Sequence, residues 1–245
     1  MKIKWILLLI LSISFSCTYQ QTTIYTIGDS TMSNKKNPDK NPEHGWGQVL
    51  PQFFKDNITI DNRAVNGRST RSFINEGRWD SILKTLKKDD YVFIQFGHND
   101  QKIKDPNRYT NPHTAYRHNL IKFVLEAREK GAIPILFSSI VRRNFNEEGT
   151  LIDTLGEYPL EVRLIAQEYN VPFIDLQFLT EQLEIAYGAK GSKKLHLHFY
   201  PGEHPFYKDG KHDDTHLSKL GATEVAKLAV LELQKVVPSL LEFLK

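Results

Sequence analysis

The stretch Thr23-Ile24-Tyr25-Thr26-Ile27-Gly28-Asp29-Ser30 says more about this chain than any other. Its first part is an unbroken run of β-branched and aromatic residues, which predicts a short strand covered on both faces, as in a parallel sheet. Gly28 allows a sharp turn at the end of that strand, and Ser30 could open a helix whose N–H groups face an anion. A serine at this place is also a common helix N-cap. The stretch therefore predicts a strand and a turn, but taken alone it does not predict a catalytic role for Ser30.

Similar apolar runs recur along the chain and alternate with helical patterns. Further strands are predicted at 58–61, 90–96, 133–138 and 171–176, and helices at 113–130, 158–169, 176–187 and 218–237. Such alternation is typical of an α/β fold in which helices cover both faces of a parallel sheet. Two stretches rich in Gly, Pro, Lys, His and Asn, 32–47 and 190–211, are expected to be long loops with a role in binding.

The N-terminus differs from the rest of the chain. Lys2 and Lys4 precede an apolar run that is too short to span a bilayer, and small residues and Cys17 follow it. This order is typical of a signal peptide, expected here over 1–17, and it disfavours a transmembrane anchor. Residues 18–245 are then expected to form a single domain.

Cys17 is the only cysteine, so no disulfide can form within the chain. Its place just after the apolar run is similar to the lipidation site of bacterial lipoproteins, and a plain signal peptide cleaved nearby is the alternative. We therefore expect an exported bacterial protein, either a periplasmic or outer-membrane and cell-surface lipoprotein or a secreted protein.

Composition excludes some function classes. Hydrophobic residues make up 40% of the chain and charged residues 25%, which is typical of a soluble globular protein. The formal charge of +3 falls to +1 when the signal segment takes Lys2 and Lys4 with it. A chain so close to neutral gives no reason to expect binding to nucleic acid.

Two polar turns follow the second and third predicted strands. Asn66-Gly67-Arg68-Ser69 contains a glycine that permits close approach of the backbone to a ligand, and Gly97-His98-Asn99-Asp100 places an asparagine amide at the same sheet edge as Ser30. A backbone N–H and an asparagine amide are the kinds of donor that stabilise an oxyanion in acyl transfer. Ordinary turns would also explain both sequences.

The stretch His212-Asp213-Asp214-Thr215-His216-Leu217-Ser218 lies far downstream. A serine hydroxyl needs a neighbouring base to take its proton, and the base needs a carboxylate to orient it. In a tight turn, Asp213 could orient His216 while His216 faces Ser30. The alternative is a polar loop that caps the last helix.

These four blocks, in this order, resemble the SGNH (GDSL-type) hydrolase family from Thr23 to Val237. The resemblance implies a three-layer, flavodoxin-like α/β fold with a five-stranded parallel sheet. It further implies that Ser30 is the nucleophile, that His216 is the base oriented by Asp213, and that no metal or organic cofactor takes part. The oxyanion donors would be the N–H of Ser30, Gly67 and Asn99.

A narrower resemblance is to the rhamnogalacturonan acetylesterase branch of that family. It rests on Gly28-Asp29-Ser30-Thr31-Met32, Gly45-Trp46-Gly47-Gln48, Asn62 to Ser69, Phe96 to Asp100 and Asp213-x-Thr215-His216. It implies a serine esterase that removes O-acetyl groups from pectic rhamnogalacturonan. An indole can pack on a sugar ring and a guanidinium can bind a carboxylate, so Trp46 and Arg68 are candidate substrate contacts. As alternatives, Trp46 could be a core residue and Arg68 a turn cation.

Other functions stay open at this point. They are an esterase for another acetylated glycan such as xylan, an esterase for small esters, and a glycan-binding protein without activity. A metal-dependent hydrolase has little support, because the nine histidines form no helical His-x-x-x-His pair. His98 and His212 are expected to be structural or binding residues. The expected partner is an acetylated polysaccharide or oligosaccharide, and the expected state is a monomer. Attachment to a membrane is expected only through a lipid anchor on Cys17.

Overall fold

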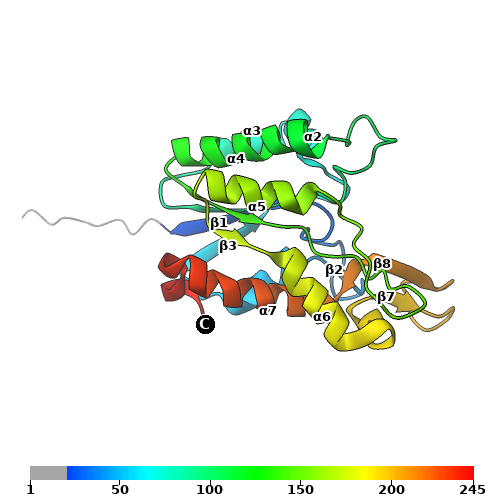
Figure 1. Ribbon diagram of the computed structural model, residues 1–245. Helices are drawn as coiled ribbons and strands as arrows, with labels where there is room; N and C mark the ends of the chain where they lie inside the picture. Colours follow the sequence, from blue (N-terminus) through cyan, green and yellow to red (C-terminus); the bar gives the residue numbers. More distant parts are fainter. Residues whose placement is uncertain (1–20) are drawn as a thin grey trace, which may run out of the picture.

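The computed structural model of the chain describes residues 21–245, so the predicted signal segment and Cys17 lie outside the described residues. Its centre is a parallel sheet in the order β3-β1-β4-β5-β6 (Figure 1). The five strands are β1 (Thr22–Gly28), β3 (Ile58–Asn62), β4 (Tyr91–Gln95), β5 (Ile133–Phe137) and β6 (Phe173–Ile174). Each of the five predicted strands is present, and the predicted five-stranded parallel sheet is confirmed.

The two central strands explain why their sequences are continuously apolar. Every residue of β4 is buried, and β1 is buried from its third residue onward, because helices cover both faces. β1 pairs with β3 on one side and with β4 on the other, so that Gly28 lies opposite Gln95. The carboxyl ends of these parallel strands therefore meet at one edge of the sheet, where ligands bind in α/β folds.

The helices lie in two layers, one on each face of the sheet (Figure 1). The helices are α1 (Trp46–Val49), α2 (Thr70–Asn75), α3 (Arg78–Leu83), α4 (Arg117–Glu129), α5 (Tyr158–Glu168), α6 (Leu176–Gly191) and α7 (Lys219–Val236). One face is covered by α2 to α5, where Trp79 and Phe123 pack edge to face. The other face is covered by α1, α6 and α7, where Trp46 and Leu233 belong to a second core cluster.

Local chemistry sets the ends of these helices. Ser218 caps α7 by accepting a hydrogen bond from the N–H of Gly221 at 3.1 Å. Gly131 follows α4 with a φ of 75°, a conformation that favours glycine and ends the helix. The predicted helix over 113–130 begins instead with a π turn, Pro112–Tyr116, before α4. The short helices α2 and α3 have six residues each, too few to show a helical period in the sequence.

The helix expected after Ser30 is absent, and that expectation was wrong. The N–H groups of Met32 and Ser33 both donate to the carbonyl of Asp29, at 3.3 and 3.1 Å, which closes one turn only. The chain then runs on without regular structure to β2.

A second, antiparallel sheet contains the segments predicted as loops. Its order is β2-β8-β7, and its strands are β2 (Glu43–His44), β7 (His196–Phe199) and β8 (Lys211–Ser218). The prediction of a loop over 190–211 is therefore partly wrong, because these residues include the end of α6 and all of β7. Leu197 and its neighbour His196 are both buried, whereas His198 and Phe199 are half-buried. No helix within residues 21–245 is long and apolar enough to cross a membrane.

Candidate active site

Ser30 stands directly beyond the carboxyl end of β1, in a turn that leaves no room for a larger residue at Gly28. A Cβ atom at Gly28 would lie 2.6 Å from the carbonyl oxygen of Gln95. The carboxylate of Asp29 closes the turn, since its Oδ1 accepts from the N–H and the hydroxyl of Thr31 at 2.9 and 2.8 Å. Ser30 is therefore held in one place at the sheet edge, with 9% of its surface exposed.

Ser30, His216 and Asp213 form a continuous chain of hydrogen bonds. The Nε2 atom of His216 lies 3.0 Å from Oγ of Ser30, and its Nδ1 atom lies 2.8 Å from Oδ2 of Asp213. Because a carboxylate only accepts, Nδ1 carries the ring proton and Nε2 is free to accept the proton of the serine hydroxyl. The arrangement is that of a nucleophile, a base and an orienting carboxylate.

Asp213 is kept ionised by what surrounds it. Partial burial raises the pKa of Asp213, but hydrogen bonds from the ring and the N–H of His216 outweigh burial and hold it well below its usual value. The other carboxylate oxygen of Asp213, Oδ1, accepts from the N–H groups of Thr215 and His216, at 3.0 and 2.9 Å. One carboxylate thus fixes both the ring and the backbone of the candidate base.

A bulge in β8 aims this pair at Ser30. His196 and Leu197 are neighbours in β7, but they pair with Leu217 and Asp213, which are four residues apart in β8. The residues 214–216 are therefore extra residues on one strand, which is how bulges redirect side chains next to active sites. The tight turn predicted before the last helix is instead this irregular part of a strand.

The candidate oxyanion donors lie in the next two turns along the sheet edge. Gly67 has a φ of 77°, a backbone conformation that favours glycine. A Cβ there would meet only Nη1 of Arg108, at 3.8 Å, so the backbone conformation and not a lack of space accounts for the glycine. Asn99 is 3% exposed, and its Nδ2 donates to the carbonyl of Arg68 at 3.2 Å. Within residues 21–245, neither the N–H of Ser30 nor that of Gly67 donates to another group, so both can bind a ligand oxygen.

A buried lysine connects the first two turns, and the sequence analysis did not identify it. Nζ of Lys35 donates to the carbonyl of Ser30 at 2.5 Å and to Oδ1 of Asn66 at 2.7 Å, and it pairs with Glu43 at 2.8 Å. Burial lowers the pKa of Lys35, and Glu43 partly offsets this. A lysine in a polar loop predicts exposure, so nothing in the local sequence marked it.

The two other histidines named from the motifs form no hydrogen bond with Ser30 in the described part of the chain. Nδ1 of His98 lies 3.3 Å from Oδ2 of Asp29, and both side chains are buried. Burial raises the pKa of Asp29, but His98 and hydrogen bonds from Thr31 outweigh it and lower the value. His212 is exposed on β8, and its ring packs against that of His198.

The predicted substrate contact of Trp46 is wrong. Its side chain is fully buried, its ring packs on Phe137, and its Nε1 donates to Oε1 of Gln95 at 2.7 Å. An indole without exposed surface offers no face to a sugar, so Trp46 is the core residue that the alternative described. Arg68 is 32% exposed and pairs with Glu76 at 3.1 Å, and its contact with substrate stays a prediction.

Arg108 and Asp105 are further residues beside the site that the motifs did not indicate. Nη1 of Arg108 lies 3.5 Å from Oδ1 of Asn99, which leaves the amide nitrogen of Asn99 facing away from the cation. Asp105 fixes that guanidinium at 2.5 Å. No group of three or more His, Cys, Asp or Glu side chains within 21–245 is arranged to hold a metal ion.

Comparison with known proteins agrees with this geometry. The family model of GDSL-like lipases and acylhydrolases matches residues 26–223. A rhamnogalacturonan acetylesterase of Bacillus subtilis (strain 168) is 46% identical over 205 residues, which cover 84% of this chain and 86% of that protein. A probable rhamnogalacturonan acetylesterase of the same organism is 38% identical over 205 residues, covering 84% of this chain and 89% of that protein.

Solved structures show the same fold. A Bacillus subtilis protein matches with a TM-score of 0.75 at 28% identity; the match covers 88% of this chain and 57% of that one. An acetylxylan esterase of Geobacillus stearothermophilus matches with a TM-score of 0.60 at 18% identity over 86% of this chain and 94% of that one, a likeness of fold alone. The predicted family is confirmed by the family model and by the two relatives: the chain belongs to the GDSL-like lipase/acylhydrolase family.

Proposed function

We propose that this protein is a serine esterase that removes O-acetyl groups from pectic rhamnogalacturonan. The observation that carries the chemistry is the hydrogen-bonded chain from Ser30 through His216 to Asp213. The support for the substrate is the 46% identity to a rhamnogalacturonan acetylesterase over most of both chains. The likeness to an acetylxylan esterase is confined to the fold, so xylan is the second candidate.

The reaction has two halves, in which the same groups exchange roles. Oγ of Ser30 attacks the acetyl carbonyl carbon while Nε2 of His216 takes the hydroxyl proton, and the carbonyl π electrons move to oxygen. The N–H groups of Ser30 and Gly67 and the amide of Asn99 would donate to that oxyanion. When the intermediate collapses, the C–O bond to the sugar breaks and His216 returns its proton to the sugar oxygen.

Water completes the cycle. It attacks the acetyl group on Ser30, gives a proton to His216, and releases acetate when His216 protonates the serine oxygen. Asp213 stays ionised throughout and stabilises the imidazolium. His216 is 31% exposed, so both a sugar ester and water can reach it from solvent.

An inactive glycan-binding protein is the alternative from another class. Binding alone gives no reason for a base 3.0 Å from a serine hydroxyl, or for N–H groups of Ser30 and Gly67 that donate to no other group within residues 21–245. This arrangement favours the enzyme.

The cellular setting follows from the N-terminal segment. Export is supported by Lys2 and Lys4 before a short apolar run, and lipid anchoring by Cys17 at its end. The mature protein would be a monomer that reaches the membrane only through that anchor. Metabolic labelling with a palmitate analogue in wild type and Cys17→Ser tests the anchor, since label retained in the variant would contradict it.

The substrate is tested by acetate release from two polymers side by side. Acetylated rhamnogalacturonan and acetylated xylan, matched for acetyl content, are incubated with the purified protein. We expect faster release from the pectic polymer. Release from xylan alone would keep the mechanism and overturn the substrate.

A further inference from the structure

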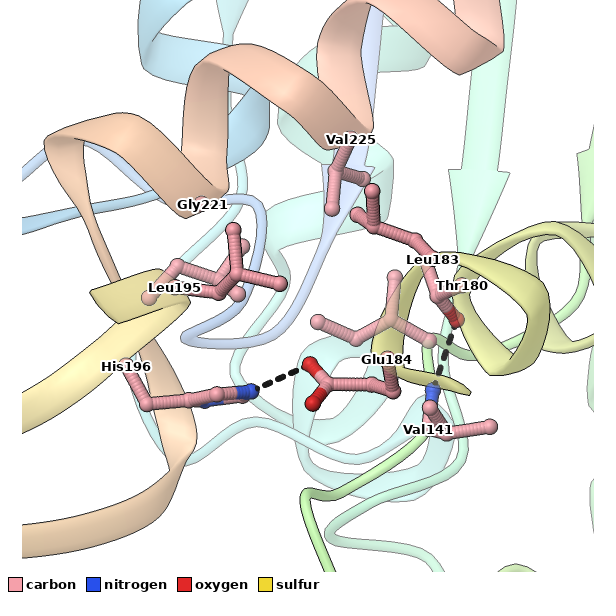
Figure 2. A pocket seen from close by; sticks show the side chains of 10 residues that line it. Val141, Thr180, Leu183, Glu184, Leu195, His196, Gly221 and Val225 are labelled. Carbon is pink, nitrogen blue, oxygen red and sulfur yellow. Dashed lines mark hydrogen bonds and ion pairs between the residues drawn. The ribbon is translucent and has the colours of Figure 1, made fainter. Parts of the chain in front are cut away.

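A buried pair of ionisable side chains lies behind the bulge that carries His216. Nε2 of His196, at the start of β7, lies 2.7 Å from Oε1 of Glu184 in α6, and these side chains are 1% and 4% exposed. Figure 2 shows the ring of His196 and the carboxylate of Glu184 pointing at each other in the lining of a small pocket, to which Leu183 and Val225 also belong. No catalytic motif includes either residue.

The other nitrogen of His196 faces the backbone of the candidate base. Its Nδ1 lies 3.1 Å from the carbonyl oxygen of His216. A carbonyl and a carboxylate are both acceptors, so a neutral ring beside an ionised Glu184 could satisfy only one of them. The carbonyl only accepts, so the contact at Nδ1 is a hydrogen bond when the ring carries a proton on Nδ1, and Nδ1–H then donates to His216.

A buried ion pair is by itself weak evidence for a contribution to stability. Apolar side chains of similar volume usually fill such a site without loss of stability, because a buried pair has to overcome the desolvation of both groups. Oε2 of Glu184 is buried without a hydrogen-bond partner in the described structure, which adds to that cost. The contact that sets the pair apart from an apolar filling is the one to the carbonyl of His216.

That carbonyl lies where the bulge ends and regular pairing resumes. On its N–H side the bulge is fixed by Oδ1 of Asp213, and on its C=O side by Nδ1 of His196. Asp214, the first residue of the bulge, is fixed by Arg143, whose Nη1 lies 2.8 Å from Oδ1 and whose N–H donates to the carbonyl of Asp214 at 2.9 Å. These contacts hold an irregular segment whose position sets the reach of Nε2 to Ser30.

We propose that His196, held by Glu184, is a positioning residue for the catalytic base. Its Nδ1–H fixes the carbonyl of His216, and this sets the line along which the imidazole meets Oγ of Ser30. The inference rests on the proposed function, in which His216 is that base. Without the contact, the backbone of His216 can shift, and the 3.0 Å contact to Ser30 lengthens.

Two substitutions of His196 separate positioning from packing. His196→Phe keeps a ring but removes both nitrogens, whereas His196→Asn keeps an N–H donor near the place of Nδ1. With p-nitrophenyl acetate as substrate, we expect His196→Phe to lower kcat by about 10- to 100-fold with little change in KM, as small misplacements of catalytic groups do. His196→Asn should restore most of the kcat.

Leu183→Ala is the matched control, because it opens the same cavity without touching the carbonyl of His216. It should lower the melting temperature and leave kcat close to wild type. If His196→Phe does not fold, Glu184→Leu and Glu184→Gln give the same comparison. Gln can donate to Nε2 of a neutral His196 and should keep kcat, whereas Leu leaves the ring unheld and should lower it.

A wild-type kcat in folded His196→Phe, or equal kcat in Glu184→Leu and Glu184→Gln, would overturn the inference. An equal loss of kcat in Leu183→Ala would do the same. Failure of the proposed function gives a different result, a wild type without esterase activity. The crystal structure of His196→Phe then decides, since an unchanged contact between His216 and Ser30 contradicts positioning and a lengthened one supports it.

Discussion

Nζ of Lys35 donates a hydrogen bond of 2.5 Å to the carbonyl oxygen of Ser30, from a side chain that is only 2% exposed. The same nitrogen binds Asn66 and pairs with Glu43, so one cation joins the nucleophile turn, the Gly67 turn and strand β2. The position of Ser30 therefore depends on a residue outside the four family blocks.

Lys35→Met should lower both stability and activity. Breaking a buried ion pair by removing one partner costs about 3–5 kcal/mol of unfolding free energy, and a shifted Ser30 should lower kcat by roughly 10-fold or more. Urea unfolding followed by circular dichroism, with kcat on p-nitrophenyl acetate, measures both. Lys36→Met changes an exposed neighbour, and equal effects in the two variants would contradict the role of Lys35.

Asn99→Ala should lower kcat by roughly 10²–10³-fold with a smaller effect on KM, because an oxyanion donor acts mainly in the transition state. Steady-state kinetics on acetylated rhamnogalacturonan oligosaccharides separates kcat from KM. Asn107→Ala, at an exposed position of the following loop, is the control. An unchanged kcat in folded Asn99→Ala would remove Asn99 from the oxyanion site.

Trp46→Ala should destabilise the protein, since Trp46 is fully buried and holds Oε1 of Gln95. Truncating a buried tryptophan costs about 3–5 kcal/mol of unfolding free energy. The milder Trp46→Phe should leave KM for oligosaccharides near the wild-type value. A large rise in KM for Trp46→Phe at normal stability would return Trp46 to the substrate site.

Stability should fall as the pH rises towards neutral, through Asp100. Burial raises the pKa of Asp100 to about 7, although Thr70 and Thr110 donate to it. Between its ordinary value and 7 the folded protein holds one more proton than the unfolded chain, so the free energy of unfolding decreases with pH in that window. Asp100→Asn keeps the acceptor oxygen and cannot ionise.

The stability of Asp100→Asn relative to wild type should therefore increase by about 3 kcal/mol between pH 5 and pH 8. Urea unfolding of both proteins at several pH values gives this difference and cancels the other titrating groups. A constant difference would show that Asp100 does not titrate there. Asp213 acts in the opposite sense, because its pKa is lowered in the folded protein. Its contribution to the free energy of unfolding is present when the pH lies above the ordinary pKa of an aspartate, and it is lost in strong acid.

A fluorophosphonate probe should label Ser30 of the wild type, because the base at 3.0 Å activates the hydroxyl. His216→Ala should abolish labelling, and His212→Ala, in the same strand, should not. Peptide mapping by mass spectrometry identifies the labelled residue. A folded wild type that takes no label at Ser30 would favour the glycan-binding alternative.

The sequence predicted those parts in which local pattern and environment agree. The run before Gly28 and the run over 90–96 are apolar because both faces are covered, and each forms a central strand. The predicted strands indicated that Ser30, Gly67 and Asn99 follow successive strands, and parallel strands bring such turns to one edge. The structure places the Ser30, Gly67 and Asn99 turns there.

The rest depended on contacts that no local pattern encodes. Lys35, Glu184 and His196 are polar residues that predict exposure, and only their distant partners explain their burial. β7 has four residues, and β8 has eight, of which only Leu217 is apolar, so neither shows the apolar run of a buried strand. The polar residues around Asp213 favoured a turn, whereas the structure has a bulge inside a strand there. Trp46 shows the opposite error, since an aromatic side chain suited to sugar is equally suited to a core.

Acetate release from acetylated rhamnogalacturonan by wild type and Ser30→Ala is the direct test of Ser30 as the nucleophile of an acetylesterase. Acetate is measured enzymatically over time, and circular dichroism confirms that both proteins are folded. We expect steady release by wild type and loss of release in Ser30→Ala to within the background of spontaneous hydrolysis. Release by Ser30→Ala at the wild-type rate, or none by a folded wild type, would contradict it.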